Sequence, residues 1–187
     1  MQMKMTGILV GLLAIAAAFC RAGETNFDAQ AAYKAEEWKN AAFSRDTAGL
    51  AQQAQAERNL AIAQALRGNQ ANDKNQNRGA IFVKAGDAER AAGELHGLAI
   101  ANYEKATENW TRAAGEYRKL TATDKALKAL QNAASAKANA KEACRKAAEA
   151  FELSADAYSE ENGNRLDQMG LVSERAATFR ERLAIWP

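Results

Sequence analysis

The sequence predicts an all-α protein, an elongated antiparallel helical bundle or coiled coil of three long helices and a short C-terminal helix. Alanine accounts for 46 of the 187 residues, aromatic residues make up 7%, and the single proline is Pro187. Alanine has the highest helix propensity, whereas an internal proline would interrupt a helix. Small and apolar residues also recur at steps of three, four and seven residues, which places them on one face of a helix. A β-rich fold is therefore not expected.

The first 22 residues have the layout of a secretory signal peptide. Lys4 supplies a positive charge, and residues 7–19 form an apolar run that is too short to span a bilayer. Small residues precede a cleavage point after Ala22. We therefore expect an exported protein, periplasmic or secreted, whose mature part is a single alanine-rich domain of residues 23–187.

Two alternatives concern the processing of this leader. Cleavage after Ala18 would also follow a run of small residues. Cys20 stands at the end of the apolar run, where an acylated cysteine would make the protein a lipoprotein. The bulky Phe19 directly before Cys20 is unfavourable for lipidation, so cleavage after Ala22 is preferred.

The charge balance excludes nucleic acid as a partner. The chain has 25 Lys and Arg residues and 23 Asp and Glu residues, and the leader contains Lys4 and Arg21 but no acidic residue. The mature chain is therefore formally neutral, whereas a nucleic-acid-binding surface needs an excess of basic residues. Membrane contact is expected only through lipidation at Cys20 or through a membrane-active surface.

Residues 26–67 predict one long amphipathic helix. They contain no proline, and their small and apolar positions recur at steps of three, four or seven: Ala31, Ala35, Trp38, Ala42, Gly49, Ala56, Leu60 and Ala63. Residues 68–79 begin and end with glycine, contain four asparagines and show no periodicity. They predict a polar loop at which the chain reverses.

Residues 80–120 predict a second long helix whose core-facing positions form a coiled-coil seam. Large or polar residues recur every seven positions, at Phe82, Glu89, His96, Tyr103, Trp110 and Tyr117. Alanines fill the positions between them, so large and small layers alternate along the seam.

A third and a fourth helix are expected at residues 124–161 and 165–184. Residues 121–124 supply side chains that cap helices, which predicts a tight turn near residue 122. The seam of the third helix is Leu130, Lys137, Cys144, Phe151 and Tyr158. The Asn-Gly-Asn sequence at 162–164 separates the third helix from the shorter fourth.

A short internal repeat supports this register. The pattern Glu-x-Trp/Phe-x-x-Ala/Ser-Ala occurs once in each long helix, beginning at Glu36, Glu108 and Glu149. It places a large side chain before a small pair that can receive a residue from a neighbouring helix. The candidate packing or interaction residues are Trp38, Trp110, Tyr117, Phe151, Tyr158 and Trp186. Trp186 is expected to fold back on the bundle or to dock into a partner.

The stretch 108–138 contains, in order, Trp110, Ala113, Ala114, Tyr117, Ala126, Leu130 and Ala133. This order resembles a degenerate tetratricopeptide repeat, although Ala138 stands where that family has a closing proline. The resemblance implies a short helical solenoid used for protein binding as the alternative fold. The unbroken alanine-rich run after Lys125 favours one long helix instead.

The sequence lacks the combinations of residues that form known catalytic or metal sites. His96 is the single histidine, and residue 93, where a di-iron bundle would need glutamate three positions before it, is glycine. We expect His96 to form a hydrogen bond across the seam. Cys144 has no disulfide partner within the chain once the leader is removed, so it is either buried or paired with another molecule, and its helical position favours burial. No catalytic, cofactor or metal site is predicted, and the protein is not expected to be an enzyme.

These observations favour a structural or protein-binding helical module. Its partner would be another protein or a second copy of the chain. The alternative is a helical effector that acts on or at a membrane surface. An enzyme would require a pocket near His96 that the periodicity does not predict.

Overall fold

The protein consists of four helices in the residues that the structure describes. The computed structural model describes residues 5–70, 78–160 and 165–186, and side chains from residue 27 onward within these ranges, except those of 69, 70 and 78. The helices are α1 (Met5–Gln70), α2 (Arg78–Lys119), α3 (Thr123–Ser159) and α4 (Leu166–Ala184). These described residues contain no strand, which confirms the all-α prediction.

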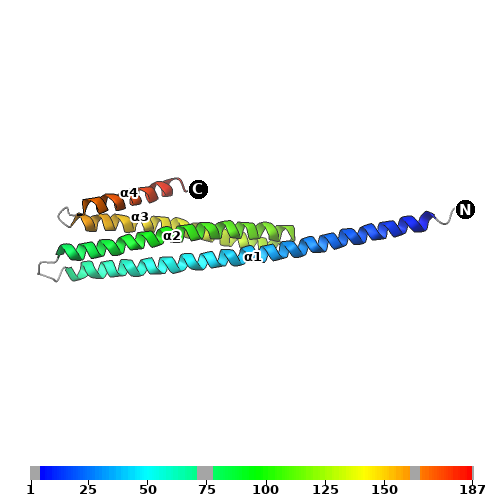
Figure 1. The fold of residues 1–187 in the computed structure, drawn as a ribbon, viewed down its shortest axis with the longest axis horizontal. Coiled ribbons are helices and arrows are strands. Elements are labelled where there is room, and N and C mark those ends of the chain that lie inside the picture. The colour runs from blue at the N-terminus through cyan, green and yellow to red at the C-terminus, as the bar shows by residue number, and fades with distance from the viewer. Residues whose placement is uncertain (1–4, 71–77, 161–164, 187) are drawn as a thin grey trace.

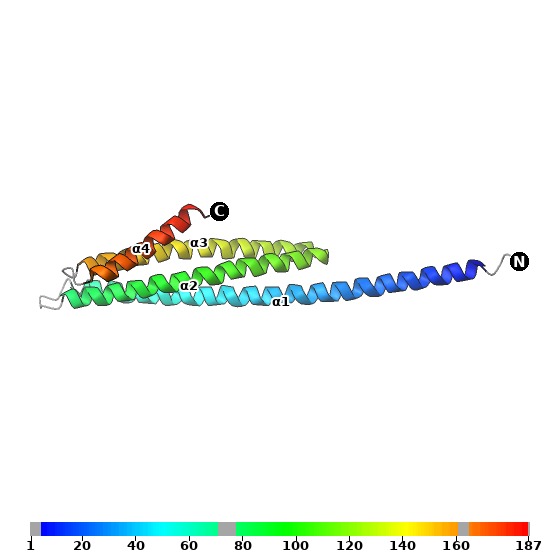
Figure 2. The same ribbon diagram turned by 45° about the horizontal axis from the view of Figure 1, so that its top comes forward.

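The helices form an elongated rod rather than a globule. Consecutive helices are antiparallel, with α2 packed between α1 and α3, and α4 packed on α3 (Figure 1). The first part of α1 runs past the turn that joins α2 to α3 (Figures 1 and 2). At the other end α4 lies along one half of α3 and stops (Figure 2). The predicted elongated antiparallel bundle is therefore confirmed.

The helix boundaries agree with the sequence to within three residues, except at the start of α1. The helix predicted for 26–67 begins at Met5, so it includes residues assigned to the leader. Residues 5–25 contain no proline and are rich in alanine and leucine, which explains why the helix continues through them. The predicted break at 162–164 and residues 71–77 of the predicted loop lie outside the described residues. The prediction of a loop is wrong at its two ends, because 68–70 belong to α1 and 78–79 belong to α2.

Alanine forms most of the core, as the seam pattern predicts. Buried alanines recur at heptad spacing, seven or fourteen residues apart in α1 at Ala35, Ala42, Ala56 and Ala63, and seven apart in α2 at Ala85, Ala92, Ala99, Ala106 and Ala113. Their short side chains allow neighbouring helix axes to approach closely. The larger buried residues lie between these alanine layers.

Three glycines receive the three most deeply buried aromatic rings of the core. A Cβ atom added at Gly49 would lie 2.8 Å from the ring of Tyr103. The same atom at Gly86 or Gly93 would lie 2.9 Å from the ring of Tyr158 or Phe151, respectively. Real Cβ atoms essentially never come this close, so the seam depends on glycine at these points and not only on the small pairs of the repeat.

The predicted turn near residue 122 is present, but its helix cap differs from the expectation. The N-cap of α3 is Ala122, with no side-chain hydrogen bond to the helix. Thr121 adopts a φ of 54°, which is strained for a β-branched residue. The turn is closed instead by backbone bonds, including the Ala122 N–H donating to the Tyr117 carbonyl at 3.0 Å.

Candidate interaction surface

The large seam residues of α2 form a ladder of polar contacts with α1. The Tyr117 hydroxyl donates to Glu36 Oε1 at 2.8 Å, and Trp110 Nε1 donates to Asp46 Oδ2 at 2.7 Å. The next two layers join Tyr103 to Gln53 at 2.9 Å and Arg67 to Glu89 by two bonds of 2.9 Å. We call these four layers, together with His96 between the last two, the polar ladder.

The polar ladder fixes the register of α1 against α2. From Trp110 to Glu89 the contacts move seven residues back along α2 and seven residues forward along α1 at each layer. Burial raises the pKa of Tyr103 to about 12, and burial together with the Glu36 carboxylate does the same for Tyr117. Both hydroxyls therefore stay protonated as hydrogen-bond donors over the physiological pH range.

His96 is the layer of the polar ladder that lacks a polar partner. Its heptad counterpart on α1 is Leu60, which cannot form a hydrogen bond. The side chain is fully buried, and neither ring nitrogen has a hydrogen-bond partner among the described residues. The predicted location in the seam is correct, but the predicted hydrogen bond across it is wrong. Burial lowers the pKa of His96, so its ring is held neutral.

The α2–α3 seam is mainly apolar. Phe151 is buried and stacks on Phe179 of α4, with the ring centroids 5.8 Å apart. Tyr158 is buried and donates to Asp87 Oδ1 at 2.7 Å. Cys144 is buried and free, as predicted, and its Sγ lies 3.5 Å from the Phe179 carbonyl oxygen.

An apolar stripe and three ion pairs hold α4 on α2 and α3. Val172 and Ala176 are buried against α3, and Phe179 and Leu183 continue the same stripe. Arginines on either side of the stripe pair with glutamates of α2 and α3: Arg175 with Glu94, Arg180 with Glu152, and Arg182 with Glu104. The part of the α2–α3 surface beneath α4 is therefore acidic at its edges.

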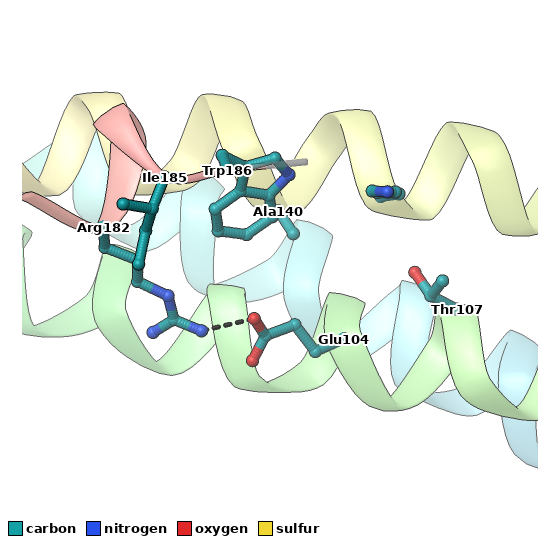
Figure 3. A pocket seen from close by; sticks show the side chains of 7 residues that line it. Glu104, Thr107, Ala140, Arg182, Ile185 and Trp186 are labelled. Carbon is teal, nitrogen blue, oxygen red and sulfur yellow. Dashed lines mark hydrogen bonds and ion pairs between the residues drawn. The ribbon is translucent and has the colours of Figure 1, made fainter.

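A hollow of about 400 Å³ opens where α4 ends. Figure 3 shows Trp186 and Ile185 above Ala140 at the α4 end of the hollow, with the Arg182–Glu104 ion pair along one side and Thr107 further along α2. Trp186 is half-buried and packs against the core, so the C-terminal tryptophan folds back on the bundle. Lys137 of α3 also lines the hollow and is exposed.

Beyond the hollow, the α2–α3 surface continues with no helix of the described residues upon it. Its residues are those that lie whole heptads away, along α2 and α3, from the residues beneath α4. We call them the open face: Thr107, Thr111 and Arg118 of α2, with Leu127, Leu130, Ala134, Lys137 and Lys141 of α3. Leu127 is 56% exposed, and Leu130 is partly buried against the core.

The structure separates the six candidate residues into two kinds. Trp110, Tyr117, Phe151 and Tyr158 are buried and serve the helix seams. Trp38 and Trp186 are half-buried near the surface, and the Arg112 guanidinium lies 4.6 Å above the Trp38 ring. The hollow brings Trp186 together with Glu104, Arg182 and Lys137. The sequence pattern presents Glu104 and Arg182 as ordinary solvated positions. The predicted place of Lys137 on the seam of the third helix is wrong, because its side chain is exposed.

No protein-family model, curated protein or solved structure matches this chain. Among the described residues there is no group of three or more His, Cys, Asp or Glu side chains placed to hold a metal ion. No helix within residues 5–70, 78–160 and 165–186 combines the length and the apolar character needed to cross a membrane.

Proposed function

We propose that the mature chain is an exported, non-enzymatic helical module that binds another protein along its rod. The proposal rests on the open face. α4 covers only part of the α2–α3 surface and leaves this face uncovered. Packed helices normally bury such a surface, and here it carries the exposed Leu127 and ends in the hollow beside Trp186.

The environment of the chemically reactive groups supports a role without catalysis. His96 and Cys144 are both completely enclosed between packed helices. Burial raises the pKa of the Cys144 thiol, whereas a nucleophilic cysteine needs a lowered one. Neither side chain therefore has the access that nucleophilic catalysis requires, and the thiol also lacks the lowered pKa.

Export is supported by the arrangement of Lys4, the apolar run 7–19 and the small residues before Ala22. Mass spectrometry of the protein purified from the producing cells should show a chain that begins at Gly23. A protein that retains Met1 would contradict the export proposal, and an acylated Cys20 at the N-terminus would replace it with the lipoprotein alternative.

Site-specific photo-crosslinking in the producing cells tests the binding function. A photoreactive residue at Thr111, on the open face, should give an adduct of discrete mass. The matched control is Ala61, which is exposed on α1 away from the open face and should give no such adduct. The absence of adducts from Thr111 and from exposed positions on all four helices would contradict the proposed function.

The membrane-active alternative would use the outer face of α1. Tyr33, Phe43, Leu50 and Ile62 are exposed, and at 100° per residue they lie within about 120° of one another around the helix. A helix that inserts into a bilayer surface needs a continuous apolar face, whereas the exposed Glu36 and Arg58 interrupt this one. We therefore expect the purified protein to leave liposomes intact, and leakage of a trapped dye would favour the alternative.

A further inference from the structure

We propose that the open face seats an amphipathic helix of a partner protein, end to end with α4, and that this helix carries acidic residues along its flanks. This inference rests on the proposed function and specifies the partner chemistry. It follows from the way α4 is held, from the charges that remain unpaired beyond it, and from the apolar residues of the open face.

The binding of α4 shows what the α2–α3 surface accepts. An apolar stripe of α4 fills the groove between α2 and α3, and Arg175, Arg180 and Arg182 pair with glutamates on the two sides. This arrangement is helix-in-groove recognition with complementary charges at the edges.

The charges change sign where α4 stops. Lys137 lies one heptad before Cys144 on α3, Lys141 lies one heptad before Ala148, and Arg118 lies two heptads after Glu104 on α2. These heptad positions place all three cations on the same faces of α2 and α3 that α4 covers further back. None of the three forms an ion pair with the described residues, so they remain available to an acidic partner.

A carboxylate near this surface does not cancel the positive charge. Glu108 pairs with Arg112 and with Lys105, both on its own helix. The helix that fits next to α4 therefore carries glutamate or aspartate at the positions where α4 carries arginine. A second copy of α4 would bring its arginines against Lys137 and Arg118, which makes self-association through this helix unfavourable.

The apolar residues and the available length specify the rest of the ligand. Leu127, Leu130 and Ala134 provide an apolar strip on α3. From Thr123 to Lys137 the exposed part of α3 spans about 20 Å at 1.5 Å per residue, which accommodates about 14 helical residues. Acidic residues in the first turn of the partner helix would meet Lys137 and would also match the positive end of that helix's own dipole.

Binding of a designed helix to the purified protein tests the inference. The probe is a stapled, fluorescently labelled 14-residue helix with leucines on one face and glutamates on both flanks, measured by anisotropy. We expect saturable binding that weakens at least tenfold in the variant Lys137→Glu/Lys141→Glu and also weakens with added salt. The matched control Lys34→Glu/Lys84→Glu reverses two exposed cations elsewhere and should bind as the unmodified protein does.

Three results would overturn the inference. The first is no binding of the acidic helix to the unmodified protein. The second is binding that does not depend on charge: the acidic helix binds the Lys137→Glu/Lys141→Glu variant equally well, or a counterpart helix with lysines in place of glutamates binds the unmodified protein as well as the acidic helix does. The third is a dimer, detected by sedimentation, that the double variant dissociates, because the occupant would then be a second copy. If the acidic helix fails but Thr111 still crosslinks to a partner, the partner chemistry is wrong while the proposed binding function stands.

Discussion

His96 lacks a hydrogen-bond partner in an interface whose other polar layers are paired. Every other layer of the polar ladder pairs a polar atom of α2 with one of α1, whereas the heptad counterpart of His96 on α1 is the aliphatic Leu60. The charged groups that act on the pKa of His96 are Glu57 of α1 and Lys146, Glu142 and Glu149 of α3. Their effects on the imidazole oppose one another, and burial determines the direction of its pKa shift.

The first prediction is an acid-dependent loss of stability that belongs to His96. Its pKa in the folded chain lies below the ordinary value of 6.5, so in moderate acid the unfolded chain binds a proton that the folded chain cannot bind. The contribution to stability is therefore complete above about pH 7 and declines as the pH falls below about 6.5. Urea unfolding of the unmodified protein and of His96→Leu should show a difference that grows in favour of His96→Leu between pH 7 and pH 5.

The difference in stability between these two proteins does not depend on the other titrating groups. Burial raises the pKa values of Asp46 and Glu89, which makes folding more favourable in acid and so opposes the effect of His96. Both proteins contain these carboxylates, and their contributions cancel in the difference. A difference between the proteins that is the same at both pH values would show that His96 does not titrate differently on folding.

The second prediction tests the register of the polar ladder directly. Leu60→Glu places a carboxylate at the α1 position opposite His96, where it should stabilise the imidazolium and raise the pKa of His96. The measurement is the titration of the imidazole resonances by NMR in the unmodified protein and the variant. Ile62→Glu is the matched control, because Ile62 is 54% exposed on the same helix. Equal shifts in the two variants would mean that Leu60 does not face His96.

At the scale of the helix, glycine sets how closely α2 can approach α3. Gly93 faces the Phe151 ring, and that ring is also stacked on Phe179, so it has little room to rotate away. Gly115 lies on the same helix with nothing within 4 Å of an added Cβ. The two glycines therefore have the same helix propensity but different steric surroundings.

The third prediction is that alanine at these two positions has opposite effects on stability. Gly115→Ala should stabilise the protein by about 0.5–1 kcal/mol, because alanine is the better helix former. Gly93→Ala gains the same propensity but overpacks the seam, which typically costs about 1–3 kcal/mol, so a net loss is expected. Urea unfolding measures both. A stabilised Gly93→Ala variant would mean that the seam can separate without cost.

For the whole molecule, the sequence predicted the helices and their faces but not their pairing. The seven-residue spacing of Trp110 and Tyr117 identified a seam without revealing that α1 supplies Asp46 and Glu36 to it. Such partners depend on the register between helices, which is a property of two sequences at once. The site on α2 and α3 where α4 packs was not predicted, for a related reason. In the sequence Arg175 and Glu94 each have the pattern of an ordinary solvated charge, and only the packing of the helices brings them together as an ion pair.

The contact that joins three helices at one level is made by Arg67 of α1. Its guanidinium binds both carboxylate oxygens of Glu89 on α2 and the Leu153 carbonyl on α3, each at 2.9 Å. Glu89 is only 2% exposed, so its charge depends on this arginine for compensation. The rod is thereby tied together close to the end at which α1 gives way to α2.

The fourth prediction is that removal of Arg67 destabilises the rod in a pH-dependent way. Arg67→Met leaves the buried Glu89 carboxylate without its cation, which should cost about 3–5 kcal/mol at neutral pH. Burial already raises the pKa of Glu89, and loss of the arginine raises it further, so protonation at lower pH should recover part of this loss. The double variant Arg67→Met/Glu89→Leu removes both charges and should be markedly more stable than Arg67→Met alone, as measured by urea unfolding at pH 7 and pH 5. Equal stability of the single and double variants at pH 7 would show that Glu89 reaches water when Arg67 is absent, and that the three helices do not hold together at this level as tightly as their packing implies.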